Sequence, residues 1–310
     1  MQPFSHRALS SQPPWLAQPE RGSRVLMHLI VRLTLALGRP VGRALLYPIC
    51  AYFLIFSVRA RRASRDYLRR VLQYEPGWRD LLAHYLCFAT TILDRTFLLA
   101  GRIDYFDCEL ESVEELLSVV AQGRGCLLFG AHFGSFEMLR LLGTVECPVP
   151  VRILMHEENA KKLNSVLAAL NPDISTQIIP LGQAQTMLSV AEALGRGEIV
   201  GLLADRAVAG DKMQWCDFLG ERAPFPEGPL ILAATLGAPV ILFSAVYQGG
   251  RRYHVRFKLF SDRVLLSRKD RSAALFGECQ RYADWLAANC RNAPYNWFNF
   301  FDFWQHESSR

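Results

Sequence analysis

Short apolar runs alternate with segments of helical periodicity along the C-terminal two-thirds of the chain, and this alternation restricts the fold more than any other feature. Alternation of this kind is typical of a mostly parallel sheet with helices on both faces. The sequence therefore predicts an α/β domain with a mostly parallel central sheet flanked by helices. The predicted strands are 125–130, 148–155, 177–180, 199–204 and 239–247, and the predicted helices are 157–170, 183–194, 230–236 and 271–290.

Other segments are less regular. Residues 103–106 are predicted to be a further strand, and Gln248-Gly249-Gly250 predicts a hairpin turn leading into a strand at 253–260. The proline-rich stretch 215–229 is predicted to be a loop. The aromatic end, 294–304, is expected either to pack on the core or to lie at a bilayer interface, where tryptophan and tyrosine are enriched.

Positive charge is concentrated near the N-terminus. Between Arg21 and Arg70 there are eleven arginines and one acid, Asp66, although the net charge of the whole chain is only +6. The apolar sequence from 25 to 58 is repeatedly interrupted, and its longest uncharged piece, 44–58, has fifteen residues, fewer than the ~20 that a spanning helix needs. This pattern favours a monotopic anchor with arginines against anionic headgroups, or a single tilted insertion.

Two other interpretations of this basic segment are weighed, and the first of them stays open. The helices of the segment can pack on their own domain with the arginines in solvent. Nucleic-acid binding is disfavoured because the arginines lie beside apolar sequence and not on a recognition motif. We therefore divide the chain into a flexible terminus at 1–22, a helical membrane-associating segment at 23–100 and an α/β domain at 101–310.

A histidine and a glutamate five positions apart, His132 and Glu137, follow the predicted strand at 125–130. Gly134 permits a turn, and Ser135 is a good N-cap for a helix that contains Glu137. We expect the turn to bring the imidazole over the first helical turn, where Glu137 accepts its proton and leaves the other ring nitrogen as a general base. A buried histidine satisfied by a neighbouring carboxylate is the structural alternative.

Asp205 and Arg206 follow the predicted strand at 199–204. Sites in open parallel sheets form at the carboxyl ends of strands, so the Asp205-Arg206 pair is expected to converge with the His132 turn. Glu227 and Gly228 precede a proline at a predicted helix start, which suits an anion-binding helix N-terminus. A loop that only connects two elements is the alternative for that segment.

The eight cysteines are scattered and include no C-x2-C pair. They indicate reduced, buried residues and neither a disulfide framework nor a metal site. The first twenty residues lack the pattern of a secretory signal. We expect no metal and no cofactor.

Four features occur in one order in this chain, and a terminal Pro294-x-x-Trp297-x-x-Phe300 follows them. Together they resemble the lysophospholipid acyltransferase superfamily, and specifically its branch of lipid A biosynthesis (late) acyltransferases. The resemblance covers most of the chain. The four features are His132-x4-Glu137, Gly201-Leu-Leu-Ala-Asp205-Arg206, the loop from Phe218-Leu-Gly220 to Pro229, and Thr235-Leu-Gly237-Ala-Pro239-Val240.

The resemblance implies a membrane-bound enzyme on the cytoplasmic face of the inner membrane. It would move an acyl chain from acyl carrier protein or acyl-CoA onto a hydroxyl of a lipid acceptor. His132 would be the base and Glu137 its orienting partner. The residues expected to bind substrate are Gly134, Ser135, Asn159, Asp205, Arg206, Glu227 and Gly228.

Two other functions are weighed against transfer. A non-catalytic lipid-binding or membrane-organising protein could keep the anchor and an acyl pocket on the same scaffold. An α/β-hydrolase or thioesterase is disfavoured because the sequence has no G-x-S-x-G elbow.

Overall fold

A computed structural model describes residues 24–141, 149–155, 177–206, 211–267 and 269–304. Within these ranges, seven strands form one sheet and two more form a separate hairpin. The strands of the sheet are β1 (Asp107–Glu111), β2 (Cys126–Gly130), β3 (Val151–Met155), β4 (Ile178–Pro180), β5 (Ile199–Leu203), β8 (Val240–Tyr247) and β9 (Arg252–Ser261).

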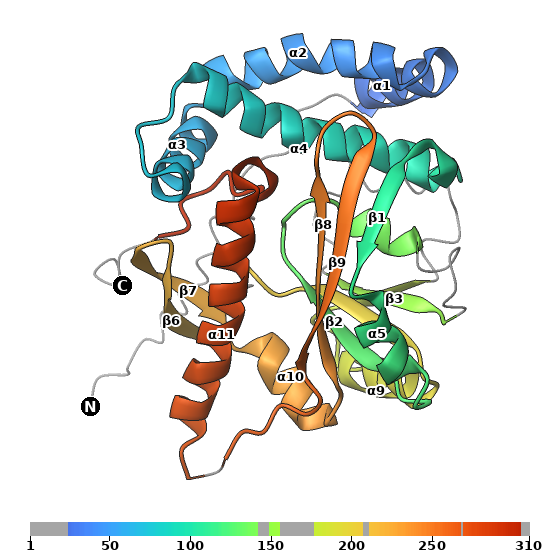
Figure 1. Ribbon diagram of the computed structural model, residues 1–310, viewed down its shortest axis with the longest axis vertical. Helices are drawn as coiled ribbons and strands as arrows, with labels where there is room; N and C mark the ends of the chain where they lie inside the picture. The colour runs from blue at the N-terminus through green and yellow to red at the C-terminus, as the bar shows by residue number, and fades with distance from the viewer. Residues whose placement is uncertain (1–23, 142–148, 156–176, 207–210, 268, 305–310) are drawn as a thin grey trace, which may run out of the picture.

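The sheet has the order β1-β9-β8-β2-β5-β3-β4. Strands β8, β2, β5, β3 and β4 are mutually parallel, whereas β9 returns antiparallel to β8 and carries β1 parallel to itself. The α/β class with a mostly parallel sheet is thus confirmed. Figure 1 shows helices on both sides of this sheet. They are α5 (Val113–Val120) and α9 (Thr186–Gly195) on one side, and α10 (Gly228–Leu236) and α11 (Arg271–Asn292) on the other.

Two predictions of local structure were wrong. Residues 103–105 form a 3-10 helix, and the strand β1 starts at Asp107. The strand was missed because acids alternate with its apolar residues; one of them, Glu111, pairs with Arg256 of β9. The predicted loop at 215–229 contains a hairpin of β6 (Met213–Phe218) and β7 (Glu221–Pro226). Its two-residue turn has positive φ at Leu219 and Gly220, as the tight turns of hairpins require. Both strands of this two-stranded hairpin are edge strands, where prolines are tolerated.

Four N-terminal helices form a layer at the end of the sheet where β8 finishes, with α4 running across that end (Figure 1). Gly77 precedes α4 and donates its N–H to Asp80 at 2.9 Å, which fixes the helix start. No described helix is by itself long and apolar enough to cross a bilayer; α2 and α3 together meet the length and composition required, but they are bent by 96°. The helices are α1 (Arg24–Leu37), α2 (Arg39–Phe56), α3 (Val58–Leu72) and α4 (Trp78–Leu99).

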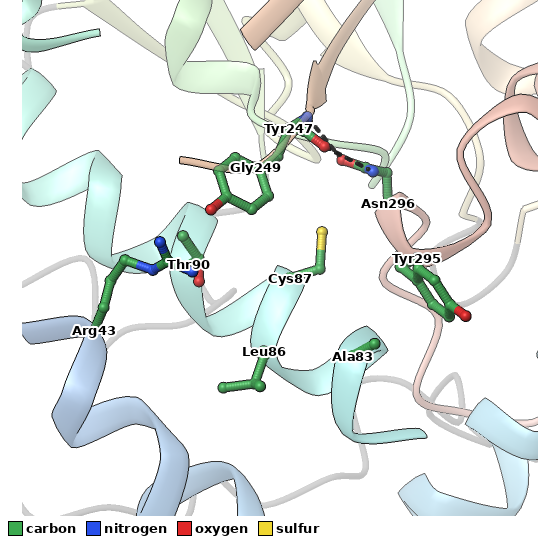
Figure 2. Close-up of a pocket in the computed structure, with 9 residues that line it drawn as sticks. All are labelled: Arg43, Ala83, Leu86, Cys87, Thr90, Tyr247, Gly249, Tyr295 and Asn296. Carbon is green, nitrogen blue, oxygen red and sulfur yellow. Dashed lines mark hydrogen bonds between the residues drawn. The ribbon is translucent and has the colours of Figure 1, made fainter. Parts of the chain in front are cut away.

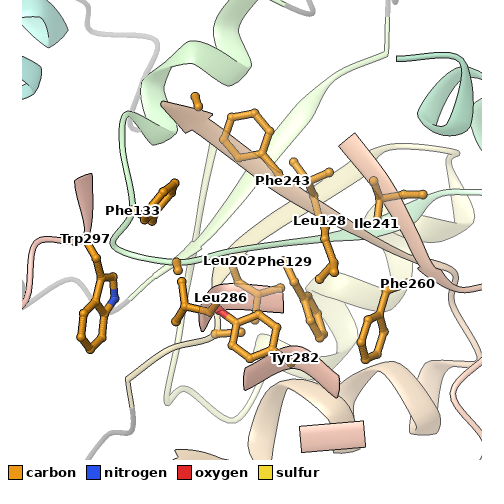
Figure 3. Packing of buried hydrophobic residues seen from close by; sticks show 14 of the residues in the cluster. Leu128, Phe129, Phe133, Leu202, Ile241, Phe243, Phe260, Tyr282, Leu286 and Trp297 are labelled. Carbon is orange, nitrogen blue, oxygen red and sulfur yellow. The ribbon is translucent and has the colours of Figure 1, made fainter. Parts of the chain in front are cut away.

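The helical layer and the sheet share one hydrophobic cluster, which extends from Leu46 on α2 to Trp304. Figure 3 shows part of it, with side chains of β2, β5 and β8 against Tyr282 and Leu286 of α11. A buried ion pair adds a second link. Arg39 on α2 donates to both carboxylate oxygens of Asp94 on α4 at 2.5 and 2.8 Å, and Tyr253 of β9 donates to the same carboxylate at 2.7 Å.

Candidate active site

His132 and Asp205 meet because of the strand register. β2 and β5 are parallel neighbours, with Gly130 opposite Leu203. The residues two positions beyond these partners are His132 and Asp205, so both side chains emerge at the carboxyl edge of the sheet. The convergence expected from the sequence is therefore confirmed.

Asp205 is the carboxylate that orients His132. Nδ1 of His132 lies 2.8 Å from Oδ1 of Asp205, and the backbone N–H of His132 donates to Oδ2 at 3.1 Å. The indole N–H of Trp297 donates to the same Oδ2, also at 3.1 Å. Asp205 is fully buried, and three donors satisfy its two oxygens.

The charges around the pair favour an ionised aspartate and a neutral histidine. Burial by itself raises the pKa of Asp205, but His132, Arg206 and the Trp297 N–H together hold that pKa well below its ordinary value. Burial and the nearby Arg206 guanidinium lower the pKa of His132, against the opposing effect of Asp205. An ionised carboxylate only accepts hydrogen bonds, so the proton of the neutral imidazole is on Nδ1.

The other ring nitrogen of His132, Nε2, makes no hydrogen bond within the described residues. The His132 side chain is 33% exposed, whereas that of Asp205 is 0% exposed. An oriented, neutral imidazole with a free and accessible nitrogen can act as a general base toward a bound hydroxyl.

Glu137 does not hold the position that the sequence predicted for it. Its carboxylate lies 2.9 Å from Nε of Arg95 on α4, and the acceptor at Nδ1 of His132 is Asp205. The cause is the path of the chain. Gly134 and Ser135 run beside β8 before a 3-10 helix, η2 (Phe136–Leu141), begins, which directs Glu137 toward α4.

Gly134 and Ser135 hold the turn in place through their backbone. The N–H of Gly134 donates to the carbonyl of Asn296 at 2.8 Å, and that of Ser135 donates to the carbonyl of Ala245 at 2.9 Å. Gly134 has a φ of +66°, and a Cβ there would lie 1.8 Å from the Ala245 oxygen. Because both amides are already engaged, the structure does not offer them to an oxyanion.

Arg206 lies beside the pair with its guanidinium held from the C-terminal segment. It donates to the carbonyl of Phe298 at 2.7 Å, and its Cζ lies 5.0 Å from the centre of the Phe301 ring. Its buried Nε has no hydrogen-bond partner among the residues described. Burial lowers the pKa of Arg206 to about 10, with Asp205 acting in the opposite direction, so the side chain is a cation at neutral pH.

The other predicted binding residues are placed less directly. Glu227 accepts from Gln214 at 2.7 Å and immediately precedes α10, whose first residue is Gly228. A small cavity joins this helix start to Phe129 and Ala204, which adjoin the catalytic strand ends, but no contact links Glu227 to His132. Asn159 lies outside the described residues.

Trp297 is the site residue that sequence reasoning missed. It was noted only as part of the Pro294-x-x-Trp297-x-x-Phe300 pattern and of an aromatic end with two possible environments. Its side chain is fully buried, and those of Phe303 and Trp304 are nearly so. This end of the chain therefore packs on the core. The pattern was the available signal, but it gave no hint of the acceptor, Asp205.

A separate pocket of about 230 Å³ lies between α2, α4 and the β8–β9 turn, and Figure 2 shows Arg43, Tyr247 and Asn296 at its edge. His132 and Asp205 do not line it. Its volume is below the ~300 Å³ at the lower end of drug-sized sites. Asn296 connects this pocket to the site: its side chain hydrogen-bonds the backbone of Tyr247, and its backbone carbonyl accepts from Gly134.

Within the described ranges, no group of three or more His, Cys, Asp or Glu side chains is arranged to hold a metal ion.

Comparison with known proteins identifies the family. The sequence pattern of the bacterial lipid A biosynthesis acyltransferases matches residues 98–306. No individual curated protein matches the chain significantly. The match covers the sheet, the His132–Asp205 pair and the C-terminal aromatic segment, which is well over half of the chain. This protein therefore belongs to the bacterial lipid A biosynthesis acyltransferase family and is an acyltransferase of that general type.

Proposed function

We propose that this protein is a membrane-associated O-acyltransferase that moves a fatty acyl chain from a thioester, on acyl carrier protein or CoA, to a hydroxyl of a lipid acceptor. The observation that carries the proposal is the 2.8 Å contact between Nδ1 of His132 and Asp205 at adjacent strand ends. That contact places the imidazole proton on Nδ1, so Nε2 is the ring nitrogen that can take a proton.

The proposed reaction is a single displacement. Nε2 of His132 takes the proton of the acceptor hydroxyl while its oxygen attacks the thioester carbonyl carbon. The tetrahedral intermediate then expels the thiolate as the C–S bond breaks, and the thiolate recovers the proton from the imidazolium. Asp205 stays ionised throughout and stabilises the imidazolium. No acyl-enzyme forms.

A cation is the group best suited to stabilise the developing oxyanion. The amides of Gly134 and Ser135 are engaged elsewhere, whereas Arg206 is half-buried beside the pair and close enough to lower the pKa of His132. Fixed charge in a site of low polarity stabilises a transition state more than it would in water. We therefore assign the role of charge stabiliser to Arg206.

Membrane association is supported by the exposed face of the helical layer. Leu29, Leu33 and Leu37 lie on one stripe of α1, and α2 exposes Ile55 and Phe56 at 56% and 61%. Exposed apolar side chains in this number mark an interaction surface. The exposed arginines of α3 that follow suit anionic headgroups, and we propose that they bind the cytoplasmic face of the inner membrane. Those arginines are Arg59, Arg62, Arg65 and Arg69.

The layer also lies at the catalytic end of the sheet. Arg95 of α4 pairs with Glu137, five residues after His132, and α4 packs against α1 and α2, the helices that carry the apolar face. A lipid acceptor held in the bilayer surface would thereby have a short path to the base.

The test is acyl transfer by purified full-length protein in detergent micelles. The probes are dodecanoyl-acyl carrier protein and dodecanoyl-CoA, each with a lipid A precursor or a lysophospholipid as acceptor. We expect an ester product with one of the acceptors and its loss in His132→Ala that remains folded. Lipid binding without transfer would instead identify a non-catalytic lipid-binding protein, and thioester hydrolysis that is faster without acceptor would identify a thioesterase.

A further inference from the structure

A second buried histidine, His84 on α4, lies behind the catalytic pair and has no role in the reaction described above. Ser64 of α3 contacts its Nδ1 at 2.8 Å, and its Nε2 lies 2.8 Å from the carbonyl oxygen of Trp297. Both Ser64 and His84 are fully buried. We infer that Ser64 and His84 are positioning residues, which fix Trp297 and through it the Asp205–His132 pair; this rests on the proposed function.

The directions of these hydrogen bonds follow from the partners. A carbonyl oxygen can only accept, so Nε2 of His84 carries the proton. Burial lowers the pKa of His84 to about 4, despite the opposing effect of the Trp297 carbonyl, so the ring is neutral at physiological pH. Nδ1 is therefore an acceptor, and the Ser64 hydroxyl donates to it. One tautomer satisfies all three groups.

Trp297 joins the Ser64–His84 pair to the catalytic turn, residues 132–135, at several points. Its indole N–H donates to Asp205 at 3.1 Å, and its backbone forms a bridge with Phe133. On either side of it, the carbonyl of Asn296 accepts from Gly134 and the N–H of Phe298 donates to the carbonyl of His132, both at 2.8 Å. A shift of Trp297 would therefore move both the carboxylate and the backbone that hold the imidazole.

This series of contacts begins at Ser64 on α3, a helix whose opposite face is basic. Ser64 and Tyr67 lie on the buried face of α3, and Tyr67 donates to the carbonyl of Pro294 at 2.7 Å and packs edge-on to the Trp297 ring. Arginines occupy the exposed face of the same helix. The position of α3 on the protein is thus connected to His132 by consecutive buried contacts: Ser64 to His84, His84 to Trp297, Trp297 to Asp205, and Asp205 to His132.

Three substitutions separate positioning from simple packing. His84→Met keeps most of the volume but removes the donor and the acceptor. His84→Gln retains one of each, and Ser64→Ala removes only the first donor. Thr96→Val is the matched control, because it deletes a buried hydroxyl on α4 whose hydrogen bond is local, to Leu93 at 2.7 Å.

Two readouts are used with the full chain in detergent micelles. The first is the low-field proton resonance of His132 Nδ1–H in 15N-histidine-labelled protein, identified by its absence in His132→Gln; it does not depend on any substrate. The second is steady-state transfer from dodecanoyl-acyl carrier protein. We expect His84→Met to shift or broaden the resonance and to lower kcat tenfold or more with little change in KM. Ser64→Ala should act in the same direction by a few-fold, and His84→Gln should recover most of both.

The result that overturns the inference is a resonance and a kcat like those of wild type in His84→Met and Ser64→Ala, with only thermal stability reduced. An equal effect of Thr96→Val on the resonance would also overturn it. If His84→Met does not fold, Ser64→Ala decides alone. If wild type transfers no acyl chain, the proposed function fails while the resonance still tests the positioning role.

Discussion

The indole N–H of Trp297 lies 3.1 Å from Oδ2 of Asp205, across 92 residues of sequence. The same oxygen accepts the backbone N–H of His132, while Oδ1 contacts the imidazole. The aspartate is therefore fixed from the C-terminal segment as well as from the catalytic turn. This arrangement predicts that a residue without substrate contact controls the basicity of His132.

Replacing Trp297 by phenylalanine should raise the pKa of His132. The Trp297 N–H stabilises the ionised form of Asp205, and without it the carboxylate becomes a stronger acceptor that favours imidazolium. The base is then protonated at higher pH, so the acid limb of kcat/KM moves to higher pH. A hydrogen bond to a charged group contributes about 1.5–3 kcal/mol, which corresponds to about one to two pKa units, so the acid limb is expected to shift by up to about that amount. Unchanged pH dependence would show that Trp297 only packs.

Asp205→Asn should abolish the base function, whereas Glu137→Gln should not remove the orienting hydrogen bond. An asparagine amide can donate to Nδ1 and so place the imidazole proton on Nε2, the wrong nitrogen. In a serine protease the equivalent change lowers kcat about 10⁴-fold, and a loss on the order of 10³ or more is expected here. The measurement is kcat together with the Nδ1–H proton resonance. Loss of that resonance in Glu137→Gln would instead support Glu137 as the partner of His132, as the sequence predicted.

The fold and the approximate site could be predicted because their signals are local. Apolar runs that end in His132 or in Asp205-Arg206 mark buried strands and their carboxyl ends. The partner of His132 could not be predicted, because local geometry favours Glu137, five residues away, while Asp205 is 73 residues away. Only the order of strands in the sheet places β5 beside β2, and that order is a property of the assembled core.

The missed elements have equally specific causes. Acids at alternate positions of β1 hide its apolar face, and they are tolerated because Glu111 pairs with Arg256 across the strands. The prolines of β7 led to the prediction of a loop, although an edge strand of a two-stranded hairpin accepts them. The orienting role of Trp297 depends on a contact made only in the folded chain, so its burial could be suspected from sequence but its partner could not.

Gly134→Ala should disrupt the catalytic turn far more than a typical glycine substitution. At Gly134 a Cβ would lie 1.8 Å from the carbonyl oxygen of Ala245, in addition to the strain of a φ of +66°. Gly123 is a matched control, with a φ of +69° but nothing within 4 Å of the added atom. Gly123→Ala should cost about 1–2 kcal/mol of unfolding free energy and retain activity. Equal losses in urea unfolding and transfer for the two variants would contradict this reading of the turn.

Arg39→Met should destabilise the packing of the helical layer on the sheet. Asp94 would then be a buried carboxylate without its cation, and removing one partner of a buried pair costs about 3–5 kcal/mol. The double variant Arg39→Met with Asp94→Leu should recover part of that loss, as measured by urea unfolding. Arg69→Met is the control, because the Arg69–Asp66 pair is exposed and such pairs contribute little. No recovery in the double variant would assign the loss to Arg39 packing alone.

Charge placed on the exposed face of α2 should release the protein from membranes. Ile55 and Phe56 are 56% and 61% exposed at the end of α2, next to the basic helix α3. Changing both to glutamate removes apolar area worth about 1.5–3 kcal/mol per side chain when buried and adds repulsion from anionic lipids. Flotation with vesicles containing phosphatidylglycerol should show a reduction in bound protein of tenfold or more. Leu265→Glu is the control, because Leu265 is 71% exposed and follows β9, a strand that ends at the end of the sheet opposite to the helical layer (Figure 1). Equal loss of binding in the two variants would mean that the membrane contacts another face.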